Sequence, residues 1–440
     1  MFDASYEGLW ADLVRHAPTD AMQDRALFLR RLARRDKSFL FPPPVFEPGV
    51  AEEVEQAGAR IVDLVRSIPQ RVFGGDWRAW ADALGFADAE RELILALRSD
   101  KMERLATHFA RPDFVLSPSG PRICEVNVSA ALGGMNEGFV FADAFRRSGL
   151  HGAMSEAGIE VDIRDTRQAW ADAVMDVAPR SRSQACPVLF DAAVDAGDPG
   201  TARQHFRDLA RAAGFTVIAG LMSELQIGDD GVSVGGIPVD LVFTMFTWWE
   251  CRHFGSREQM LQLAALSERG LVDYLSPLIT AIFDNKANLE FLSRPAWRHL
   301  FDASERAFLD RYVPETFRLT RDTLAEAIER RAELVVKPAD EWAGRGVLFG
   351  HDIAADAWAP LLADRLAAGS FVCQKAIDLA VTRDVPFAGA THAYTMSLGP
   401  LLFGGRHAGL YVRQMGDVTG VPVLNAKLGA EAGYAYGRRR

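Results

Sequence analysis

The stretch Ile123-Cys124-Glu125-Val126-Asn127 is the most informative part of this sequence of 440 residues. Its acid and its amide stand two positions apart, so in a β-strand both side chains leave the same face. Upstream, residues 111–116 (RPDFVL) predict the partner strand. Residues 117–121 (SPSGP) predict the turn between the two strands, because proline, serine and glycine favour tight turns. The sequence therefore predicts a hairpin across this region.

The hairpin brings three oxygen-bearing side chains, those of Asp113, Glu125 and Asn127, to one end of a sheet. Carboxylate and amide oxygens are hard ligands that suit Mg²⁺, an ion that usually keeps several waters and shares the phosphates of a substrate. A surface hairpin with scattered polar residues explains the Glu-x-Asn pattern alone about equally well. A magnesium site therefore needs a phosphate-binding partner elsewhere in the chain.

A candidate for that partner is Glu333-Leu334-Val335-Val336-Lys337-Pro338, a short apolar run that ends in a lysine and a proline. A loop containing Gly344 and Gly346 follows, and then a second apolar run, Val347-Leu348-Phe349. The pattern predicts a strand, a turn and a return strand, in which the lysine lies over phosphates and loop N–H groups close on them. The loop is not a Walker A loop, because no Gly-Lys-Ser/Thr opens a helix. An ordinary hairpin with a solvated lysine is the alternative.

Together, the two segments resemble the ATP-grasp ligases, in the circularly permuted branch that includes glutathionylspermidine synthase-like proteins. In that branch the Glu-x-Asn strand precedes the Val-Val-Lys-Pro strand, as it does here. The resemblance covers about residues 105–436 and includes four further segments: 284–292 (DNKANLEFL), 371–376 (FVCQKA), 404–413 (GGRHAGLYVR) and 423–430 (VLNAKLGA). After Asn127, residues 128–134 (VSAALGG) lack the Ala-Asp-Thr-Pro-Thr run of glutathionylspermidine synthases. The resemblance therefore carries the ATP chemistry but not the substrate of those enzymes.

The resemblance implies an α/β fold with a circularly permuted ATP-grasp core. Its parts would be a helical N-terminal region (1–104), the metal-binding part of the core (105–154), a Rossmann-like substrate domain (155–280) and the nucleotide-binding lobe with closing strands (281–440). Apolar residues at three- and four-residue steps independently predict helices before residue 110, which could cap the core or form a packing layer. The strand, helix and strand pattern over 187–219 predicts a βαβ unit. Residues 236–243 predict a further strand, led in by a hairpin, and 321–331 a helix.

The resemblance also implies ATP and Mg²⁺ as cofactors and gives roles to individual residues. Asp113, Glu125 and Asn127 would hold the metal ion. Arg413 would hold an acyl phosphate, and Arg111 would orient the carboxylate or the γ-phosphate, with a salt bridge to Asp113 as the alternative for Arg111. Seven residues would contact the nucleotide: Lys286, Lys337, Gly344, Gly346, Gln374, Lys375 and Ala376.

Aromatic residues are dense after the strand predicted at 236–243, where Trp248, Trp249 and Glu250 stand in a row. Filling a domain junction is the simpler role for the two tryptophans. In the alternative, this row lines the acceptor pocket, because the ends of strands face the cleft in open α/β domains. The resemblance favours the pocket and adds Arg406 to the residues on the substrate side.

Composition narrows the partners and the compartment. Hydrophobic residues make up 49% and charged residues 25%, as in ordinary globular proteins, and the net charge of −10 argues against a general nucleic-acid or membrane surface. The N-terminus lacks the features of a signal peptide, and no run of eighteen apolar residues occurs. Four cysteines without a CxxC pair predict reduced thiols in the cytoplasm: Cys124, Cys186, Cys251 and Cys373.

The expected reaction joins a carboxylic acid to an amine through an acyl phosphate and releases ADP and phosphate. The family-level expectation for the two substrates is an amino acid, a small peptide or a polyamine, and a homodimer is common among such ligases. Two alternatives stay open. The first is a scaffold protein that binds ATP without catalysis, and the second is a kinase that releases a phosphorylated small acid.

Overall fold

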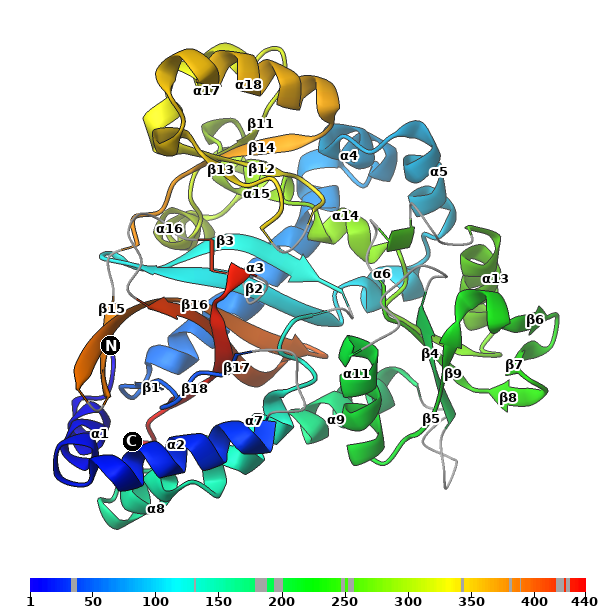
Figure 1. Ribbon diagram of the computed structural model, residues 1–440. Coiled ribbons are helices and arrows are strands. Elements are labelled where there is room, and N and C mark those ends of the chain that lie inside the picture. The colour runs from blue at the N-terminus through cyan, green and yellow to red at the C-terminus, as the bar shows by residue number, and fades with distance from the viewer. Residues whose placement is uncertain are drawn as a thin grey trace.

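The computed structural model describes residues 1–32, 38–129, 132–178, 188–193, 201–246, 250–251, 257–341, 344–379, 382–387, 389–416, 423–424 and 428–440. Within them the chain forms a mixed α/β structure with four sheets. Figure 1 shows the largest sheet in the middle, a smaller lobe above it and a parallel sheet to one side. No described helix combines the length and the apolar character that crossing a bilayer requires.

The central sheet has seven strands in the order β1-β18-β17-β16-β2-β3, and β15 pairs with β16. The predicted hairpin is confirmed, because β2 and β3 are antiparallel and Ser117 pairs with Gly120 across the turn. Asp113 faces Glu125 across the two strands, and a bulge follows directly after this pair. The bounds of the strands are: β1, Val45–Phe46; β2, Phe109–Ser117; β3, Gly120–Val128; β15, Thr382–Phe387; β16, Ala390–Phe403; β17, Arg406–Gly416; and β18, Glu431–Gly437.

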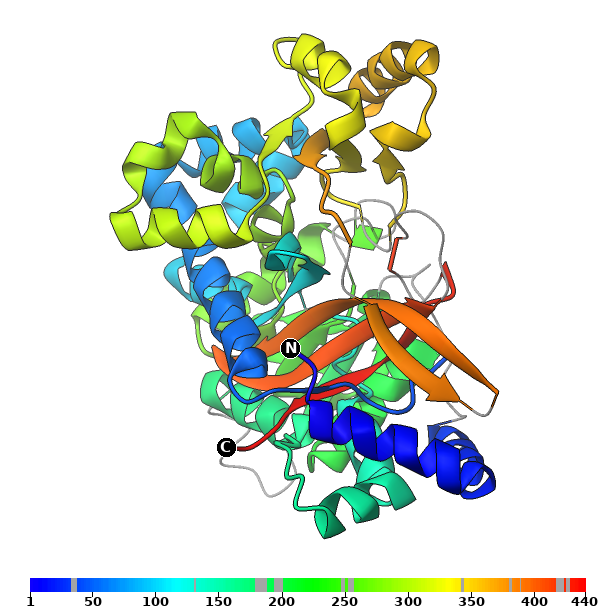
Figure 2. The ribbon, with the colours of Figure 1, turned by 90° about the vertical axis from the view of Figure 1, so that its left-hand side faces the viewer.

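The N-terminal region is helical, as predicted, except for the edge strand β1, which pairs in parallel with β18. The long helix α3 lies against one face of the central sheet, where Gly58 comes so close that a Cβ would stand 2.7 Å from Pro400 Cγ. Figure 2 shows this layering from the side. The helices of this region are: α1, Ala4–His16; α2, Pro18–Leu32; α3, Val50–Phe73; α4, Trp77–Leu84; α5, Asp88–Ala96; and α6, Asp100–Ala106.

The upper lobe contains a four-stranded sheet in the order β11-β14-β12-β13, and it has a small hydrophobic core of its own. The predicted return strand is confirmed, since Val335 pairs with Phe349 in an antiparallel register. The helix predicted over 321–331 is shorter than expected, and a 3₁₀ turn at Arg331–Glu333 follows it. The elements are: α15, Asn288–Ser293; α16, Ala303–Tyr312; β11, Thr316–Arg318; α17, Leu324–Glu329; β12, Leu334–Pro338; β13, Leu348–Phe349; α18, Ala355–Ala368; and β14, Phe371–Lys375.

The parallel sheet β10-β9-β4-β5 contains the predicted βαβ unit, in which α11 joins β4 to β5. The single strand predicted over 236–243 is wrong. The chain breaks at Asp240, so that β8 belongs to a small antiparallel sheet with β6 and β7, while β9 enters the parallel sheet. The strands are: β4, Val188–Ala193; β5, Thr216–Leu221; β6, Gln226–Gly228; β7, Gly231–Val234; β8, Ile237–Val239; β9, Leu241–Thr244; and β10, Asp273–Leu275.

The remaining helices connect these sheets. Helices α7, α8 and α9 follow the β2–β3 hairpin. Helices α11 and α13 flank the parallel sheet, and α14 leads into the upper lobe (Figure 1). Their bounds are: α7, Gly138–Arg146; α8, Gly149–Glu156; α9, Thr166–Val177; α11, Thr201–Ala212; α13, Arg257–Glu268; and α14, Thr280–Asp284. Short 3₁₀ turns lie at Met222–Glu224, Pro295–Leu300 and Gly350–Asp352.

Candidate active site

A cleft lies between the central sheet and the upper lobe, and it encloses about 860 Å³, including space open to solvent. Pockets of this size hold small-molecule ligands and cofactors. The central sheet contributes Glu125, Ser397 and Arg413 to its lining, and the upper lobe contributes Lys337 and Gln374. Because β-strand side chains alternate, Val335 and Lys337 of β12 share the face that looks into the cleft.

On the sheet side, Asp113 is fully buried and holds two guanidinium groups. Arg111 donates from Nε to Oδ1 at 2.7 Å and from Nη2 to Oδ2 at 2.9 Å, and Arg413 donates from Nη2 to Oδ2 at 2.6 Å. Burial opposes the charge on Asp113, but the two guanidinium groups outweigh burial and hold the pKa of this carboxyl well below its usual range. Asp113 is therefore an anion that is already paired within the protein.

Arg111 makes the salt bridge that stood as the alternative for it. The third contact of its guanidinium is a hydrogen bond from Nη1 to the carbonyl oxygen of Gly133 at 2.5 Å, and its plane lies over the ring of Tyr411. Arg111 thus links the β2–β3 hairpin to the loop after β3, and it is not part of the lining of the cleft.

Glu125 and Asn127 lie on the edge strand β3 of the same sheet and are partly exposed. Glu125 Oε2 lies 3.4 Å from Lys286 Nζ. Asn127 donates from Nδ2 to the carbonyl oxygen of Arg111 at 3.1 Å, which fixes the orientation of its amide. Glu125 lines the cleft, whereas Asn127 does not, and Asp113 faces Glu125 from the neighbouring strand β2.

Lys286 stands in the turn between α14 and α15. Its Nζ donates to the carbonyl oxygen of Glu341 at 2.6 Å. Burial opposes its charge, but Glu125 and Asp284 outweigh burial and raise the pKa of Lys286. Lys286 is therefore held as a cation beside Glu125 of the β2–β3 hairpin.

Lys337 reaches across the cleft from the upper lobe. Its Nζ donates to Gln374 Oε1 at 2.7 Å and to the carbonyl oxygen of Cys124 at 3.4 Å. Gln374 is in turn anchored by donating from Nε2 to Thr316 Oγ1 at 3.1 Å. Burial lowers the pKa of Lys337. An anion placed beside this lysine would stabilise its charged form and so oppose this lowering of the pKa.

The glycine-containing loop lies against the closing segment of the chain. Gly344 has a φ of +73°, and a Cβ there would stand 2.5 Å from Val423 Cγ1. Gly346 has a φ of +66°, and a Cβ there would stand 2.9 Å from Pro338 Cγ. Only glycine fits both the left-handed backbone and these close approaches. The loop and Val423 therefore cover the cleft together.

Residues 374–376, which were expected to contact the nucleotide, are placed only in part as predicted. Gln374 lines the cleft, but the side chain of Lys375 is exposed, and the backbone N–H groups of Lys375 and Ala376 donate to the carbonyl oxygens of Glu315 and Glu333. Sequence reasoning missed the apolar residues that follow, Ile377 and Leu379, which line the cleft with Val335, Val347 and Phe349. Their alternation directly after the strand was the signal that could have identified them.

Of the other predicted substrate residues that the structure describes, neither Glu250 nor Arg406 lines this cleft. Trp248 and Trp249 fall outside the described residues, and Glu250 is described but does not line the cleft. Arg406 forms an exposed ion pair with Asp176 at 2.6 Å, at the end of β17 opposite to Arg413. Seven residues of strand separate the two arginines by roughly 23 Å.

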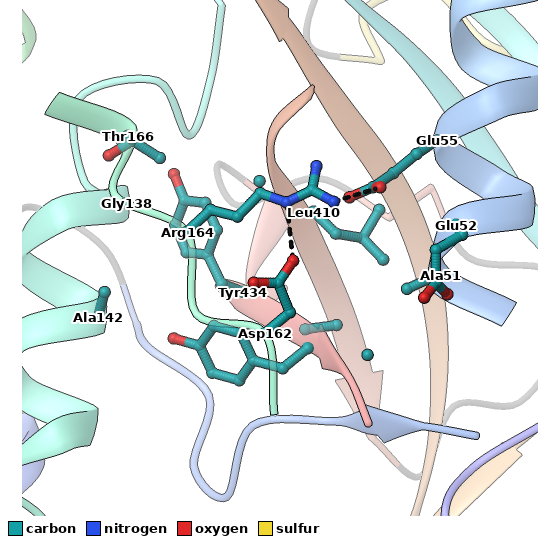
Figure 3. Close-up of a pocket in the computed structure, with 14 residues that line it drawn as sticks. Ala51, Glu52, Glu55, Gly138, Ala142, Asp162, Arg164, Thr166, Leu410 and Tyr434 are labelled. Carbon is teal, nitrogen blue, oxygen red and sulfur yellow. Dashed lines mark hydrogen bonds and ion pairs between the residues drawn. The ribbon is translucent and has the colours of Figure 1, made fainter. Parts of the chain in front are cut away.

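A second, smaller pocket lies at the other end of the central sheet, between α3 and β18. Figure 3 shows Arg164 between Glu55 of α3 and Asp162, with Nη2 of the arginine 2.9 Å from Glu55 Oε2 and its Nε 3.0 Å from Asp162 Oδ2. Burial raises the pKa of Glu55 to about 7, and the ion pair with Arg164 only partly opposes this. This pocket is far from the lysines and belongs to the packing of the sheet edge.

No protein-family model and no curated protein matches the sequence. The structure is similar to that of a glutathione synthetase-like effector from Globodera pallida in its apo form, with a TM-score of 0.57, 13% identity, and coverage of 94% of this chain and 96% of that chain. D-alanyl-alanine synthetase A from Vibrio cholerae is a weaker match, with a TM-score of 0.30, 9% identity, and coverage of 57% of this chain and 88% of that chain. The first likeness shows a common fold over nearly the whole chain.

Proposed function

We propose that the cleft binds ATP with Mg²⁺ and that the protein is an ADP-forming ligase, which joins a carboxylic acid to an amine. The observation that carries the proposal is the meeting of Glu125, Lys286, Lys337 and Arg413 at one cleft, although they come from four widely separated segments. The fold shared with an effector named after glutathione synthetase supports the same class of reaction.

The two lysines fit a polyphosphate. Both are partly buried and line the same cleft, Lys286 from the α14–α15 turn and Lys337 from β12. Each ammonium keeps at least one N–H beyond the contacts described above, because an ammonium has three donors. We assign Lys286 and Lys337 to the phosphates and the apolar lining around Val335 and Phe349 to the base.

The donor set at the hairpin fits Mg²⁺ through Glu125 and Asn127, which are partly exposed and share one face of β3. A carboxylate and an amide are ligands that Mg²⁺ accepts, with waters and phosphate oxygens to complete its shell. Asp113 would join them only by sharing an oxygen that now accepts from Arg111 or Arg413, because both of its oxygens are hydrogen-bonded to a guanidinium group. When bound, the ion would neutralise charge on the phosphates during transfer.

The acid substrate belongs beside Arg413, the guanidinium that lines the cleft. This arginine would hold the oxygens of the acyl group while the amine attacks, because a planar guanidinium matches a carboxylate or a phosphoryl group. Arg111, which does not line the cleft, would position Asp113 and the loop after β3. Closure of the loop at Gly344 and Gly346 would exclude water, which hydrolyses an acyl phosphate.

The test is an ATP-consumption screen across amino acids, small peptides and polyamines, with mass spectrometry to identify a condensed product. A ligase consumes ATP only when an acid and an amine are both present. A kinase that phosphorylates a small acid consumes ATP with the acid alone, and an ATP-binding scaffold consumes none. Lys337→Ala must abolish any turnover found, while Lys101→Ala, a lysine that binds the carbonyl oxygen of Ser267 on α13, must keep it.

A further inference from the structure

Ser397 and Arg413 form a cross-strand pair on the face of the central sheet that looks into the cleft. Ser397 of β16 is in register with Arg413 of β17, and both side chains line the cleft. Directly opposed residues of an antiparallel pair have their Cβ atoms about 5 Å apart. Ser397 is only 3% exposed. Sequence reasoning did not identify this serine, because its place beside Arg413 depends on strand pairing.

Both members of the pair have a buried polar atom without a partner. Among the described residues, Ser397 Oγ and Arg413 Nε have no hydrogen-bond partner, although Arg413 donates from Nη2 to Asp113. Buried polar groups in folded proteins are nearly always hydrogen-bonded, and leaving a donor unpaired costs free energy. Two such donors on neighbouring strands indicate that the partner is a ligand.

The charge of the surroundings defines the ligand. Asp113 and Glu125 carry two negative charges, and the three cations paired with them, those of Arg111, Arg413 and Lys286, carry three positive charges, so this cluster has an excess positive charge. Gly399 is the next residue of β16 on the same face. The side chain of Arg111 fills the space beside it, since a Cβ at Gly399 would stand 2.8 Å from Arg111 Cδ. An excess cation with two free donors selects an oxyanion.

We propose that Ser397 is a substrate-binding residue and that its hydroxyl and Arg413 Nε together hold an oxyanion at the reacting end of the acid substrate. The oxyanion is the carboxylate of the acid, or a phosphoryl oxygen once the acid is phosphorylated. This assignment rests on the proposed function and adds a contact to it. Val115, which is in register with Ser397 on β2 and lines the same cleft, would cover the apolar side of that group.

The test compares Ser397→Ala with Ser119→Ala, a serine on the exposed β2–β3 turn away from the cleft. Inorganic phosphate and acetate are titrated by calorimetry, with and without MgADP, and melting temperatures are measured. We expect Ser397→Ala to bind phosphate about tenfold more weakly, as for loss of a hydrogen bond to a charged group. Its MgADP affinity should be unchanged, and its melting temperature should not fall, since the hydroxyl has no hydrogen-bond partner in the described part of the chain. Ser119→Ala should match the wild type throughout.

If Ser397→Ala weakens the binding of phosphate but not of acetate, the Ser397–Arg413 pair holds a phosphoryl oxygen. If the variant weakens the binding of both anions, the pair holds the carboxylate of the acid. Equal affinities for both anions in Ser397→Ala and the wild type overturn the assignment, and so does a fall in melting temperature without a change in anion affinity. If the alanine variant does not fold, Ser397→Cys decides the same question. Failure of the wild type to bind MgADP would overturn the proposed function instead, and the titration without nucleotide still decides on the pair.

Discussion

Arg413 of β17 donates to Asp113 of β2 at 2.6 Å across 300 residues of sequence, and this ion pair ties together two strands that are separated by β16 in the central sheet. Asp113 is fully buried and holds Arg111 as well. The charges at the floor of the cleft are therefore arranged before any ligand arrives. Such preorganised groups need little rearrangement during the reaction.

The first prediction concerns this floor. Asp113→Asn removes the one anion between two buried guanidinium groups, so it should lower the free energy of unfolding by about 3 to 5 kcal/mol. Urea unfolding followed by circular dichroism measures the change. Asp176→Asn, which breaks the exposed pair with Arg406, is the matched control and should cost no more than about 1 kcal/mol. Equal costs for the two variants would contradict the buried network.

The second prediction concerns the two lysines. Lys337→Ala and Lys286→Ala should each weaken the affinity for a non-hydrolysable ATP analogue by about 1.5 to 3 kcal/mol, the range for hydrogen bonds to charged groups. Calorimetry measures the affinity, with Lys101→Ala as the control. An unchanged affinity in both variants would remove the phosphates from this cleft.

The third prediction separates backbone strain from contact in the glycine-containing loop. Gly344 and Gly405 have nearly the same φ, +73° and +74°, but a Cβ at Gly344 collides with Val423 Cγ1, whereas a Cβ at Gly405 meets nothing within 4 Å. Both alanine variants pay for the left-handed backbone, roughly 1 to 2 kcal/mol. Only Gly344→Ala should also weaken nucleotide affinity, which the same calorimetry measures. A similar loss in Gly405→Ala would mean that the loop does not act through this contact.

The fourth prediction concerns pH and the pocket of Figure 3. Burial raises the pKa of Glu55 to about 7, so folding favours the protonated acid. The stabilisation is present below the ordinary pKa of about 4.3 and is lost as the pH rises through about 7. Glu55→Gln should remove this loss and gain up to about 3 kcal/mol relative to the wild type between pH 4 and pH 8. Urea unfolding at a series of pH values tests it, and parallel curves for the two proteins would contradict the raised pKa.

Arg413 and Arg406 provide a test of structure against sequence. The sequence placed both arginines on the substrate side, but the structure places only Arg413 at the cleft. Arg413→Ala should abolish turnover, because it also leaves Asp113 with a single partner, while Arg406→Ala should keep turnover within about twofold, as for an exposed pair. Steady-state kinetics with the substrate pair found in the screen measures both. Loss of activity in Arg406→Ala would restore the sequence-based assignment.

The β2–β3 hairpin was predictable because the sequence pattern that indicates it is local. Alternation along residues 123–127 and a tight turn over residues 117–121 define the register, and Asp113 indeed faces Glu125. The return strand after the loop at Gly344 was predictable for the same reason. Alternation and turn chemistry act over a few residues, so one sequence shows them.

Other features were beyond local patterns. The strand predicted over 236–243 splits at Asp240, because the two halves pair with different sheets, and pairing is a tertiary choice. Ser397 gains its place only from register with Arg413. The backbone N–H groups of Lys375 and Ala376 bind the lobe itself, which no motif records. The sites that remain proposals are those formed by side chains from distant segments.

The nucleotide product tests the central claim most directly. The protein is incubated with MgATP and with the acid and amine that the screen identifies, and the nucleotide is analysed by ³¹P NMR or chromatography. An acyl-phosphate ligase produces ADP and phosphate in a one-to-one ratio with the amide, and hydroxylamine in place of the amine traps a hydroxamate. We predict ADP, because Lys286, Lys337 and Arg413 line one cleft, where the lysines would hold the phosphates and a carboxylate beside Arg413 could reach the γ-phosphoryl group. Stoichiometric AMP and pyrophosphate would contradict the proposed reaction.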